Sequence, residues 1–396
     1  MLHQKIAELR PTWVEIDLDS CSQNIKAIKK KLEAYGSRSS RIAAVVKADG
    51  YGHGAVQVAR TALQAGADWL AVAFVDEGLA LREAGITAPI LVLGWTPHNT
   101  AEKAIKAELS LTVPHQENAR ALSEAAQRVG QSVRIHIKVD TGMGRLGFSA
   151  DDDGADAVCS VLEYEGLKLE GVFTHFSVAD EDQVYTQRQI RRYRSFITAL
   201  KARGISVPIR HTANSAAILD FPGVSFDMVR PGIMLYGIYP TEKVSRSVSV
   251  RPFLRWKTQV SQVTEYPAGS SISYGRTFVS DRPTTIATLP VGYADGYPRV
   301  LSNQGEVLIE GHRCQIAGRV CMDQTMVVVP DSVGHIDTNT VATLIGTDGR
   351  EEITVDELAE LSDTIAHEIF TGISKRVPRV FLKDGQIQTV SDVLHI

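Results

Sequence analysis

The chain has 396 residues, of which 44% are hydrophobic and 22% are charged, and its formal net charge at pH 7 is −4. This length exceeds the size at which a single hydrophobic core stops growing, so we expect two domains in a globular protein. The slightly acidic balance, with Lys and Arg scattered along the chain, excludes the continuous basic surface that nucleic-acid binding requires. Nucleic acid is therefore not an expected partner.

The apolar segments indicate neither export nor membrane insertion. Residues 1–13 lack the apolar centre of a secretory signal, and no uninterrupted apolar run approaches the ~18 residues of a membrane span. We therefore expect a cytoplasmic protein without a membrane partner. The four cysteines form no CxxC pair, which predicts free thiols in a reducing compartment and no bound metal.

From Trp13 to about residue 245, short β-rich runs alternate with amphipathic helical segments, as in repeated βα units. About eight such strands favour an α/β fold with a (β/α)8 TIM-type barrel over an open doubly wound sheet, although counting does not separate the two firmly. The expected strands are residues 13–18, 42–47, 69–74, 89–94, 109–113, 133–140, 167–175, 207–212 and 226–230, with helices at 115–130 and 181–203.

After Gly237 the helical periodicity largely stops, and β-branched segments separated by Gly, Pro and Asp predict a second, mostly β domain. One segment, residues 354–373, is expected to be helical, with Thr354 or a neighbouring residue as its N-cap. We place the boundary within residues 238–250, which gives a barrel domain of residues 1–245 and a β-rich domain of residues 246–396.

The first segment that carries chemistry is IAAVVKADGYGHG, an apolar strand that ends at Lys47 and passes into a glycine-rich loop. Barrel enzymes keep their chemistry at the carboxyl ends of the strands. Loss of solvent there would lower the pKa of the lysine and free its amine to form a Schiff base. Taken alone, however, a lysine at a strand end is more often a surface residue.

The segment KVDTGMGRLG, residues 138–147, contains a literal GxGxxG after a strand, so a dinucleotide site has to be weighed. The fingerprint requires a helix to open at its third glycine, Gly147. FSADDDG follows instead, so we reject this interpretation. The acidic run Asp151 to Asp153 is expected to begin a capped helix rather than to bind a metal.

Five segments in chain order resemble the motifs of bacterial alanine racemases: VVKADGYGHG, KVDTGMGRLG, HTANSAA, DMVRPGIMLYG and SISYGRTF. The resemblance extends from about Trp13 to Phe381. It implies a pyridoxal 5'-phosphate-dependent racemase that interconverts L- and D-alanine and supplies D-alanine for peptidoglycan. It also implies a head-to-tail homodimer with two composite active sites.

The resemblance assigns roles to individual residues. Lys47 would carry the cofactor as a Schiff base and act as one proton-transfer base, and Tyr274, lent by the partner, would act as the other. The residues expected to bind the cofactor are Lys47, Tyr51, His175, His211, Asn214, Ser215, Arg230, Gly232, Ile233 and His367. Those expected to bind the substrate are Arg145, Met322, Asp323 and Lys138, the last commonly carbamylated in the family. A narrow pocket opening would be lined by Asp180, Tyr293, Arg299, Arg319 and Ile365.

In the family, the residue matching Arg230 faces the pyridine nitrogen of the cofactor. Because an arginine cannot accept a proton, it should keep that nitrogen unprotonated and make the ring a weaker electron sink, which discourages transamination. The residue matching His175 bonds the phenol of Tyr274 and contacts Arg230. Such a network would lower the cost of ionising the phenol.

One position departs from the family pattern: His367 stands where a tyrosine is usual before the ISKRVPR segment. A histidine still donates a hydrogen bond to phosphate but is shorter than a phenol, so we expect retained cofactor binding and a pocket that admits serine. The alternatives are therefore a serine or broad-specificity racemase, a decarboxylase on a similar barrel, and a non-enzymatic cofactor carrier. Arg230 opposes the decarboxylase, and the C-terminal region opposes the carrier.

Overall fold

The computed structural model describes residues 10–36 and 40–392. It divides into two compact units. The first, called here the barrel unit, consists of Ser20–Gly50 and Ala55–Pro252. The second, the β unit, consists of residues 10–19, 51–54 and 253–392 in its described part. Within the described ranges, no helix combines the length and the apolar content that a membrane crossing needs.

The barrel unit contains eight parallel strands in the order β10-β2-β3-β4-β5-β6-β8-β9. Between β9 and β10 two backbone hydrogen bonds, from Asp227 N to Arg210 O at 3.0 Å and from Arg230 N to Ala213 O at 2.9 Å, bring the two ends of the sheet together. The predicted TIM-type barrel is confirmed, and it is nearly closed. The strands are β2 (Arg41–Val45), β3 (Trp69–Val72), β4 (Ile90–Trp95), β5 (Ser110–Val113), β6 (Val133–Asp140), β8 (Leu167–Phe173), β9 (Ile209–His211) and β10 (Met228–Val229).

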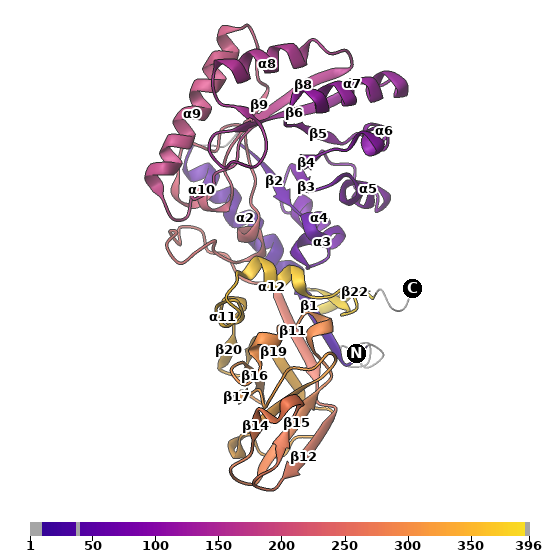
Figure 1. The fold of residues 1–396 in the computed structure, drawn as a ribbon, viewed down its shortest axis with the longest axis vertical. Helices are drawn as coiled ribbons and strands as arrows, with labels where there is room; N and C mark the ends of the chain where they lie inside the picture. The colour runs from indigo at the N-terminus through magenta and orange to yellow at the C-terminus, as the bar shows by residue number, and fades with distance from the viewer. Residues whose placement is uncertain (1–9, 37–39, 393–396) are drawn as a thin grey trace. The chain divides into compact units, whose positions relative to one another are not determined.

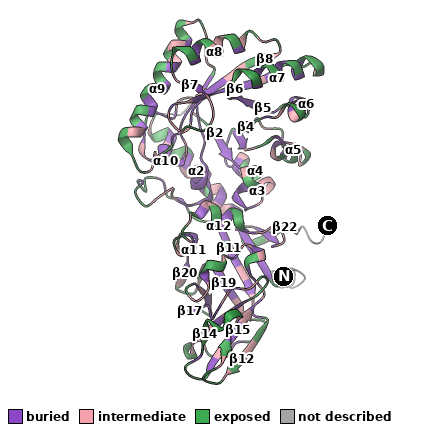
Figure 2. Ribbon diagram, in the orientation of Figure 1, coloured by how far each residue is buried: buried purple, intermediate pink, exposed green. Residues whose placement is uncertain are grey.

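Continuous apolar runs make the barrel strands, because parallel strands covered by helices are buried on both faces. In β3 all four residues are buried, and in β2 only Arg41 is exposed. Figures 1 and 2 show the helices outside these buried strands, with their exposed faces outward. They are α2 (Leu18–Ala34), α3 (Lys47–Tyr51), α4 (Ala55–Gln64), α5 (Val75–Glu83), α6 (His98–Lys106), α7 (Gln116–Val129), α8 (Asp152–Leu162), α9 (Gln183–Ala202) and α10 (Ser215–Asp220), with the 3-10 turn η1 (Ile233–Tyr236) and the short strand β7 (Phe148–Ser149).

The predicted helices of this unit are confirmed, and local capping explains where they begin. The Asp151 carboxylate accepts a hydrogen bond from Gly154 N at 2.9 Å and so caps α8, at the acidic run. Asp182 caps α9 in the same way through Tyr185 N. Side-chain acceptors at this position satisfy amides that have no partner within the helix.

The strand expected at residues 13–18 is a strand but does not belong to the barrel, so that expectation was wrong. The observed β1 (Thr12–Asp17) pairs antiparallel with β11 (Leu254–Gln259) and parallel with β21 (Arg379–Lys383) in the β unit. Its residues are almost wholly buried, and Trp13 packs against Val380. A short apolar run fixes the strand conformation, whereas the choice of sheet depends on partners distant in sequence.

The β unit is built mainly from antiparallel sheets, as the β-branched segments predicted. An eight-stranded sheet has the order β17-β16-β19-β11-β1-β21-β22 with β20 beside β19, and a three-stranded sheet has the order β12-β15-β18. A two-stranded ribbon pairs β13 with β14. The remaining strands are β12 (Gln262–Tyr266), β13 (Ser271–Ile272), β14 (Phe278–Val279), β15 (Thr284–Leu289), β16 (Glu306–Ile309), β17 (His312–Gln315), β18 (Thr325–Val329), β19 (Val341–Asp348), β20 (Glu351–Ile353) and β22 (Gln386–Ser391).

The helical segment expected at residues 354–373 forms two helices, α11 (Val355–Leu361) and α12 (Ala366–Gly372). Thr354 is the N-cap, because its hydroxyl accepts a hydrogen bond from Glu357 N at 3.0 Å. Asp363, which lies between the helices, has a positive φ of 51°. A residue in this left-handed conformation ends a helix, so the single predicted helix is broken here.

Candidate active site

Lys47 follows β2 and opens a turn in which five successive residues, 48 to 52, have positive φ angles. The φ values of Ala48, Asp49 and Gly50 are 52°, 53° and 61°. Each non-glycine residue in this conformation costs about 1–2 kcal/mol. Two carboxylates offset that cost: Glu77 Oε1 accepts from Ala48 N at 2.6 Å, and Asp49 Oδ1 accepts from Ala55 N at 2.9 Å. Strain retained in this way is typical of functional sites.

The surroundings of Lys47 favour its neutral amine. Burial lowers its pKa, and the positive charge of Arg145 lowers it further, whereas the Glu77 carboxylate acts in the opposite direction. A neutral amine is the nucleophile that carbonyl compounds require. The lysine singled out from its strand-end position therefore has the electrostatics of a reactive group.

Arg230 follows β10 and is 3% exposed. Its Nη1 lies 2.9 Å from His211 Nδ1, and its Nη2 donates to the carbonyl oxygens of Thr174 and Thr212 at 2.8 and 3.0 Å. Its Cζ lies 5.3 Å from the centroid of the Phe173 ring. Burial lowers the pKa of Arg230 to about 10, so the guanidinium stays charged at neutral pH. Whatever it binds must accept hydrogen bonds.

Other cationic side chains lie near Arg230. Burial together with the charges of Arg230 and Arg145 lowers the pKa of Lys138 to about 7, although Asp140 raises it. Lys138 Nζ donates to the carbonyl oxygen of the adjacent residue at 3.0 Å. Burial and the same cations, with Lys138 and Lys47, hold the pKa of His175 well below its usual value. Groups that depress one another's pKa in this way form a site for anions.

Ser215 lies where two short helical segments begin. Asn214 caps α10 through its own side chain, and Ser215 Oγ accepts hydrogen bonds from Gly232 N at 3.0 Å and Met234 N at 3.3 Å. Gly232 is the N-cap of η1, whose first residue is Ile233. Backbone N–H groups at the start of helical turns favour negative charge. This arrangement suits a phosphate.

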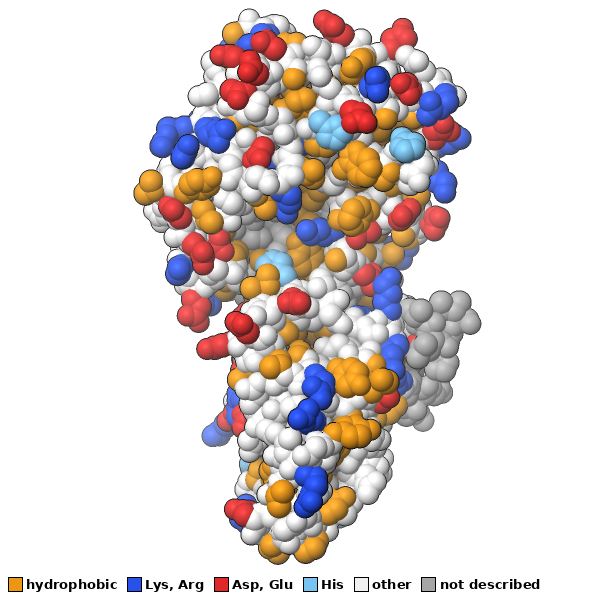
Figure 3. All heavy atoms as spheres, in the orientation of Figure 1, with side chains coloured by type: hydrophobic (Ala, Val, Ile, Leu, Met, Phe, Trp, Pro, Cys, Tyr) orange, Lys and Arg blue, Asp and Glu red, His pale blue; other side chains and the backbone are white. Residues whose placement is uncertain are grey.

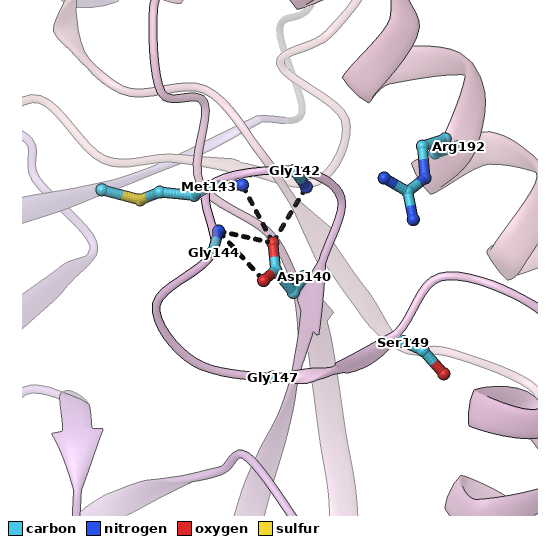
Figure 4. Close-up of a pocket in the computed structure, with 7 residues that line it drawn as sticks. All are labelled: Asp140, Gly142, Met143, Gly144, Gly147, Ser149 and Arg192. Carbon is cyan, nitrogen blue, oxygen red and sulfur yellow. Dashed lines mark hydrogen bonds between the residues drawn. The ribbon is translucent and has the colours of Figure 1, made fainter.

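The glycine-rich loop after β6 is not such a site (Figure 4). The Asp140 carboxylate accepts hydrogen bonds from three consecutive backbone N–H groups, those of residues 142–144, at 2.9 to 3.2 Å. An anion of the protein thus uses the amides that a bound phosphate would need. Gly147, at φ 127°, is followed by strand β7 rather than by a helix, in agreement with the rejected dinucleotide fingerprint. The pocket beside the loop, also lined by Ser149 and Arg192, is open.

In the β unit, Tyr274 begins the 3-10 turn η2 (Tyr274–Arg276) and is 72% exposed. Its non-glycine neighbours are strained, because Ser273 and Arg276 have φ values of 64° and 51°. Ser273 Oγ donates to Arg319 O at 2.6 Å and fastens the turn to the next loop. A phenol held out from the surface on a strained turn is an unusual packing residue and a good candidate for a functional group.

Two further loops of the β unit meet beside a buried ion cluster. Backbone hydrogen bonds join the turn at Tyr293 to the loop at Met322. Asp295 is fully buried and accepts from Arg10 and Arg376, and Arg376 also donates to Asp323 at 2.6 Å. Burial opposes ionisation of Asp295, but these hydrogen bonds outweigh it and lower its pKa. The cluster therefore fixes the loop at Met322.

Tyr51 and His367 belong to the same unit although 316 positions apart, and their ring centroids are 5.8 Å from each other. Tyr51 is 7% exposed, and burial raises its pKa, so its phenol is a neutral donor. His367 lies in α12 and is half-buried. The unusual histidine is thus adjacent to a second residue expected to contact phosphate.

The expected residues fall into two groups. Those in the barrel unit are Lys47, Lys138, Arg145, His175, Asp180, His211, Asn214, Ser215, Arg230, Gly232 and Ile233. Those in the β unit are Tyr51, Tyr274, Tyr293, Arg299, Arg319, Met322, Asp323, Ile365 and His367. Sequence reasoning missed Glu77, His136 and Glu170, which support Lys47 and Arg230. The available signal for the last two was the alternation of polar and apolar residues along β6 and the first half of β8.

Comparisons with known proteins agree over almost the whole chain. Residues 16–240 match the family model described as alanine racemase, N-terminal domain, and residues 253–381 match alanine racemase, C-terminal domain. Alanine racemase of Symbiobacterium thermophilum is 48% identical over 94% of this chain and 97% of its own length. Alanine racemase 2 of Caldanaerobacter subterraneus subsp. tengcongensis is 43% identical over 98% and 99%. The crystal structure of alanine racemase from Bacillus anthracis with bound L-Ala-P has a TM-score of 0.91 and 41% identity, covering 97% of this chain and 98% of that one.

Proposed function

Because this chain belongs to the alanine racemase family, we propose that it interconverts L- and D-alanine with Lys47 and Tyr274 as the two proton-transfer groups. It is a pyridoxal-phosphate-dependent racemase. The observation that carries the proposal is the neutral-favouring environment of Lys47 at the end of a barrel strand. Mirror-image amino acids have equal free energies, so the enzyme needs a proton acceptor and a proton donor on opposite faces of the α-carbon.

The residues of the barrel unit fit the cofactor. Lys47 offers the amine for a covalent bond, and the Ser215 hydroxyl, with the backbone amide of Ile233 at the start of η1, offers donors for the phosphate. The Gly232 amide donates to Ser215 Oγ and so orients that hydroxyl. The cationic surroundings of Lys47, Lys138 and Arg230 match the negative charge of that phosphate and of a substrate carboxylate. When bound, pyridoxal phosphate supplies an electron-accepting ring that stabilises negative charge at the α-carbon.

We assign opposite tasks to the two proton-transfer residues. Lys47 Nζ, once released from the cofactor, exchanges a proton with one face of the α-carbon. Tyr274 Oη exchanges a proton with the other face, and after each turnover the two groups have swapped their protonation states. Arg230 remains a pure donor throughout, and Arg145 and the Met322 loop hold the carboxylate.

The exposure of Tyr274 supports a site that two copies share. The β unit exposes further large apolar side chains, among them Met322 at 53%, Ile365 at 61% and Tyr293 at 42%. In Figure 3 apolar side chains alternate with Lys and Arg on the visible face of this unit. Exposed apolar groups are typical of interaction sites, and in a two-fold symmetric dimer each such contact would occur twice, once for each protomer.

A complementation experiment tests both the residues and the sharing. Lys47→Ala and Tyr274→Phe are prepared separately and then co-expressed. Each alone should lose activity, and Lys47→Ala should also lose the absorbance of the lysine-bound cofactor. Random pairing gives half mixed dimers, each with one intact site, so about a quarter of wild-type activity should return.

Lys106→Ala and Tyr164→Phe, changes at an exposed lysine and at a half-buried tyrosine outside the site, serve as controls. Proton exchange at Cα should slow more for one enantiomer than for the other in Tyr274→Phe. Absence of any activity gain on mixing would refute the shared site. Equal slowing for both enantiomers would refute the assignment of two separate bases.

We further propose that Lys138 carries a carbamate. With a pKa of about 7 the buried amine is partly neutral, and its lone pair attacks the carbon of CO2. An N–C bond forms, one C=O π bond breaks and leaves its electron pair on oxygen as the carbamate charge, and the nitrogen loses a proton to solvent. The product replaces a cation beside Arg145 and Arg230 by an anion, which relieves their repulsion. A carbamate signal in 13C NMR after equilibration with labelled bicarbonate, absent in Lys138→Met, tests this proposal.

The physiological proposal is supply of D-alanine for peptidoglycan in the cytoplasm. Expression of the chain should restore growth of a bacterium that requires D-alanine, and the Lys47→Ala variant should not. The alternatives of a serine racemase, a decarboxylase or a cofactor carrier are not favoured by the relatives, which are alanine racemases over nearly their full length.

A further inference from the structure

A chain of polar side chains crosses the interior of the barrel from Arg230 to Glu170. Arg230 Nη1 lies 2.9 Å from His211 Nδ1, and His211 Nε2 lies 2.8 Å from His136 Nδ1. His136 Nε2 lies 3.2 Å from Glu170 Oε2. Both histidines are 0% exposed, whereas the Glu170 side chain retains 18% exposure. The chain therefore connects a buried cation to a carboxylate that reaches the surface of the unit.

Only one arrangement of hydrogens satisfies every contact in this chain. Arg230 has no acceptor, so His211 Nδ1 must accept, and its hydrogen sits on Nε2. That hydrogen is donated to His136 Nδ1, which places the hydrogen of His136 on Nε2. The carboxylate of Glu170 then accepts the last hydrogen bond. Each histidine is neutral in this arrangement.

The charge state of the chain agrees with this arrangement. Burial lowers the pKa of His136, and burial with the charge of Arg230 holds the pKa of His211 well below its usual value. Burial opposes ionisation of Glu170, but hydrogen bonds from His136 and Ser110 outweigh it and lower its pKa. The acceptor at the end of the chain is thus present at neutral pH.

Neighbouring strands of the barrel leave room for this row of polar side chains and hold Glu170 at its end. A side chain at Gly171 would place its Cβ 2.4 Å from His136 Nδ1 and 2.8 Å from Ile209 O, so only glycine leaves room for the ring. Ser110 on β5 donates to the same Oε2 that accepts from His136. Arg134 lies 3.5 Å from the other oxygen, Oε1. Side chains from two strands, β5 and β6, therefore hold Glu170 of β8 in place.

We propose that Glu170, acting through His136 and His211, is a positioning residue that holds Arg230 as a hydrogen-bond donor at the cofactor; this inference rests on the proposed function. Without an acceptor at Oε2, the His136 ring has no partner for a hydrogen on Nε2, so the preference for that tautomer weakens and the tautomer with its hydrogen on Nδ1 becomes populated. That hydrogen faces His211 Nε2 and drives the second ring into the opposite tautomer. His211 Nδ1–H then opposes the Arg230 N–H, and the guanidinium shifts.

Two variants separate the effect of the hydrogen-bond acceptor at Glu170 Oε2 from the effect of the negative charge of the carboxylate. In Glu170→Gln the amide oxygen takes the place of Oε2, so Ser110 and His136 still have their acceptor although the charge is lost. Glu170→Leu removes both. Glu102→Gln, at an exposed carboxylate paired with Arg128, is the matched control. We expect the leucine variant alone to disturb the chain.

Tautomers are read directly by 15N NMR of the apoprotein labelled at histidine, with assignments made through His136→Asn. In wild type, Glu102→Gln and Glu170→Gln, both rings should carry their hydrogen on Nε2. In Glu170→Leu both tautomers should be populated. This readout needs no cofactor and no turnover, so it stands even where the proposed reaction fails.

The holoenzyme provides the second readout. Glu170→Leu should lower kcat about tenfold, the scale of one unsatisfied buried donor, with KM changed less than twofold, and should raise the fraction of turnovers that end in transamination. Glu170→Gln should stay within about threefold of wild type. A hydrogen on His211 Nδ1 in wild type, or wild-type tautomers in Glu170→Leu, would overturn the proposal. The wild-type spectrum decides the matter even where the leucine variant does not fold.

Discussion

Replacing Glu77 by glutamine should loosen the turn that presents Lys47. The carboxylate has two oxygens in use: Oε1 accepts from Ala48 N at 2.6 Å, and Oε2 accepts from Ala73 N at 2.6 Å and Phe74 N at 3.2 Å. An amide has one oxygen and one NH2 group, so only one side keeps an acceptor. The orientation that preserves two bonds turns the NH2 group toward Ala48. The loss therefore falls on the strained turn.

The expected magnitude follows from the bond that is lost. A hydrogen bond to a charged group contributes about 1.5–3 kcal/mol, and because Ala48 is exposed the lower half of this range applies. A cost of about 1.5–2 kcal/mol corresponds to roughly 10- to 30-fold more frequent local opening. The pKa of Lys47, which Glu77 raises, should fall further below its usual value.

Hydrogen–deuterium exchange measured by mass spectrometry checks this prediction. Exchange in the segment of residues 46–50 should accelerate by that factor in Glu77→Gln, while residues 72–76 should change little. Glu83→Gln, an exposed change in the same helix, is the control. Unchanged exchange at residues 46–50, or a raised pKa of Lys47, would refute the role given to Glu77.

Three further outcomes follow from the structure. Asp295→Asn should lower the free energy of unfolding by about 3 kcal/mol in urea titrations, because it leaves two arginines without a buried counter-ion. Hydrogen bonds lower the pKa of the Asp295 carboxyl despite its burial. The stabilisation in the wild type should therefore be present above the unfolded-state pKa and be lost as pH falls through the folded-state pKa. Burial and nearby arginine charge lower the pKa of Lys138 from 10.5 to about 7. In buffer free of CO2 the unfolded state therefore binds more protons than the folded state between these two pH values, and the free energy of unfolding should rise with pH across that range. Lys138→Met should abolish the rise. Gly147→Ala should disrupt the loop after β6, because residue 147 has a φ of 127° and the new Cβ would lie 2.7 Å from a backbone nitrogen. In Gly144→Ala the new Cβ has no atom within 4 Å, so this variant should lower the free energy of unfolding by only about 1 kcal/mol in the same titration.

Local sequence was sufficient for most elements of the fold. The barrel strands were predictable because each is a short apolar run between helical segments, and α8 because Asp151 offers a cap. The segment at Trp13–Asp17 has the same local pattern but pairs with strands near residues 254 and 379. No property of the run itself encodes these partners, which explains why it was assigned to the wrong sheet.

The candidate site was likewise only partly predictable from local sequence. Lys47 was predicted because it ends a strand and is followed by glycines, and its assigned role came from the motif. The contribution of Glu77 was hidden, because an acidic residue in the first turn of a helix is ordinarily a dipole partner. His136 and Lys138 alternate with apolar residues in β6, so their shared inward face was readable, but their hydrogen-bond partners required coordinates.

The pairing of β1 has a consequence for how the polypeptide is made. Its neighbour β11 emerges from the ribosome about 240 residues later, which at common synthesis rates of about 5–20 residues per second is a delay of roughly 10 to 50 seconds. Throughout that interval an apolar segment with Trp13 and Val14 has no sheet to join. Chaperones that shield nascent chains should therefore engage this segment first, and premature termination before residue 254 should yield aggregating fragments.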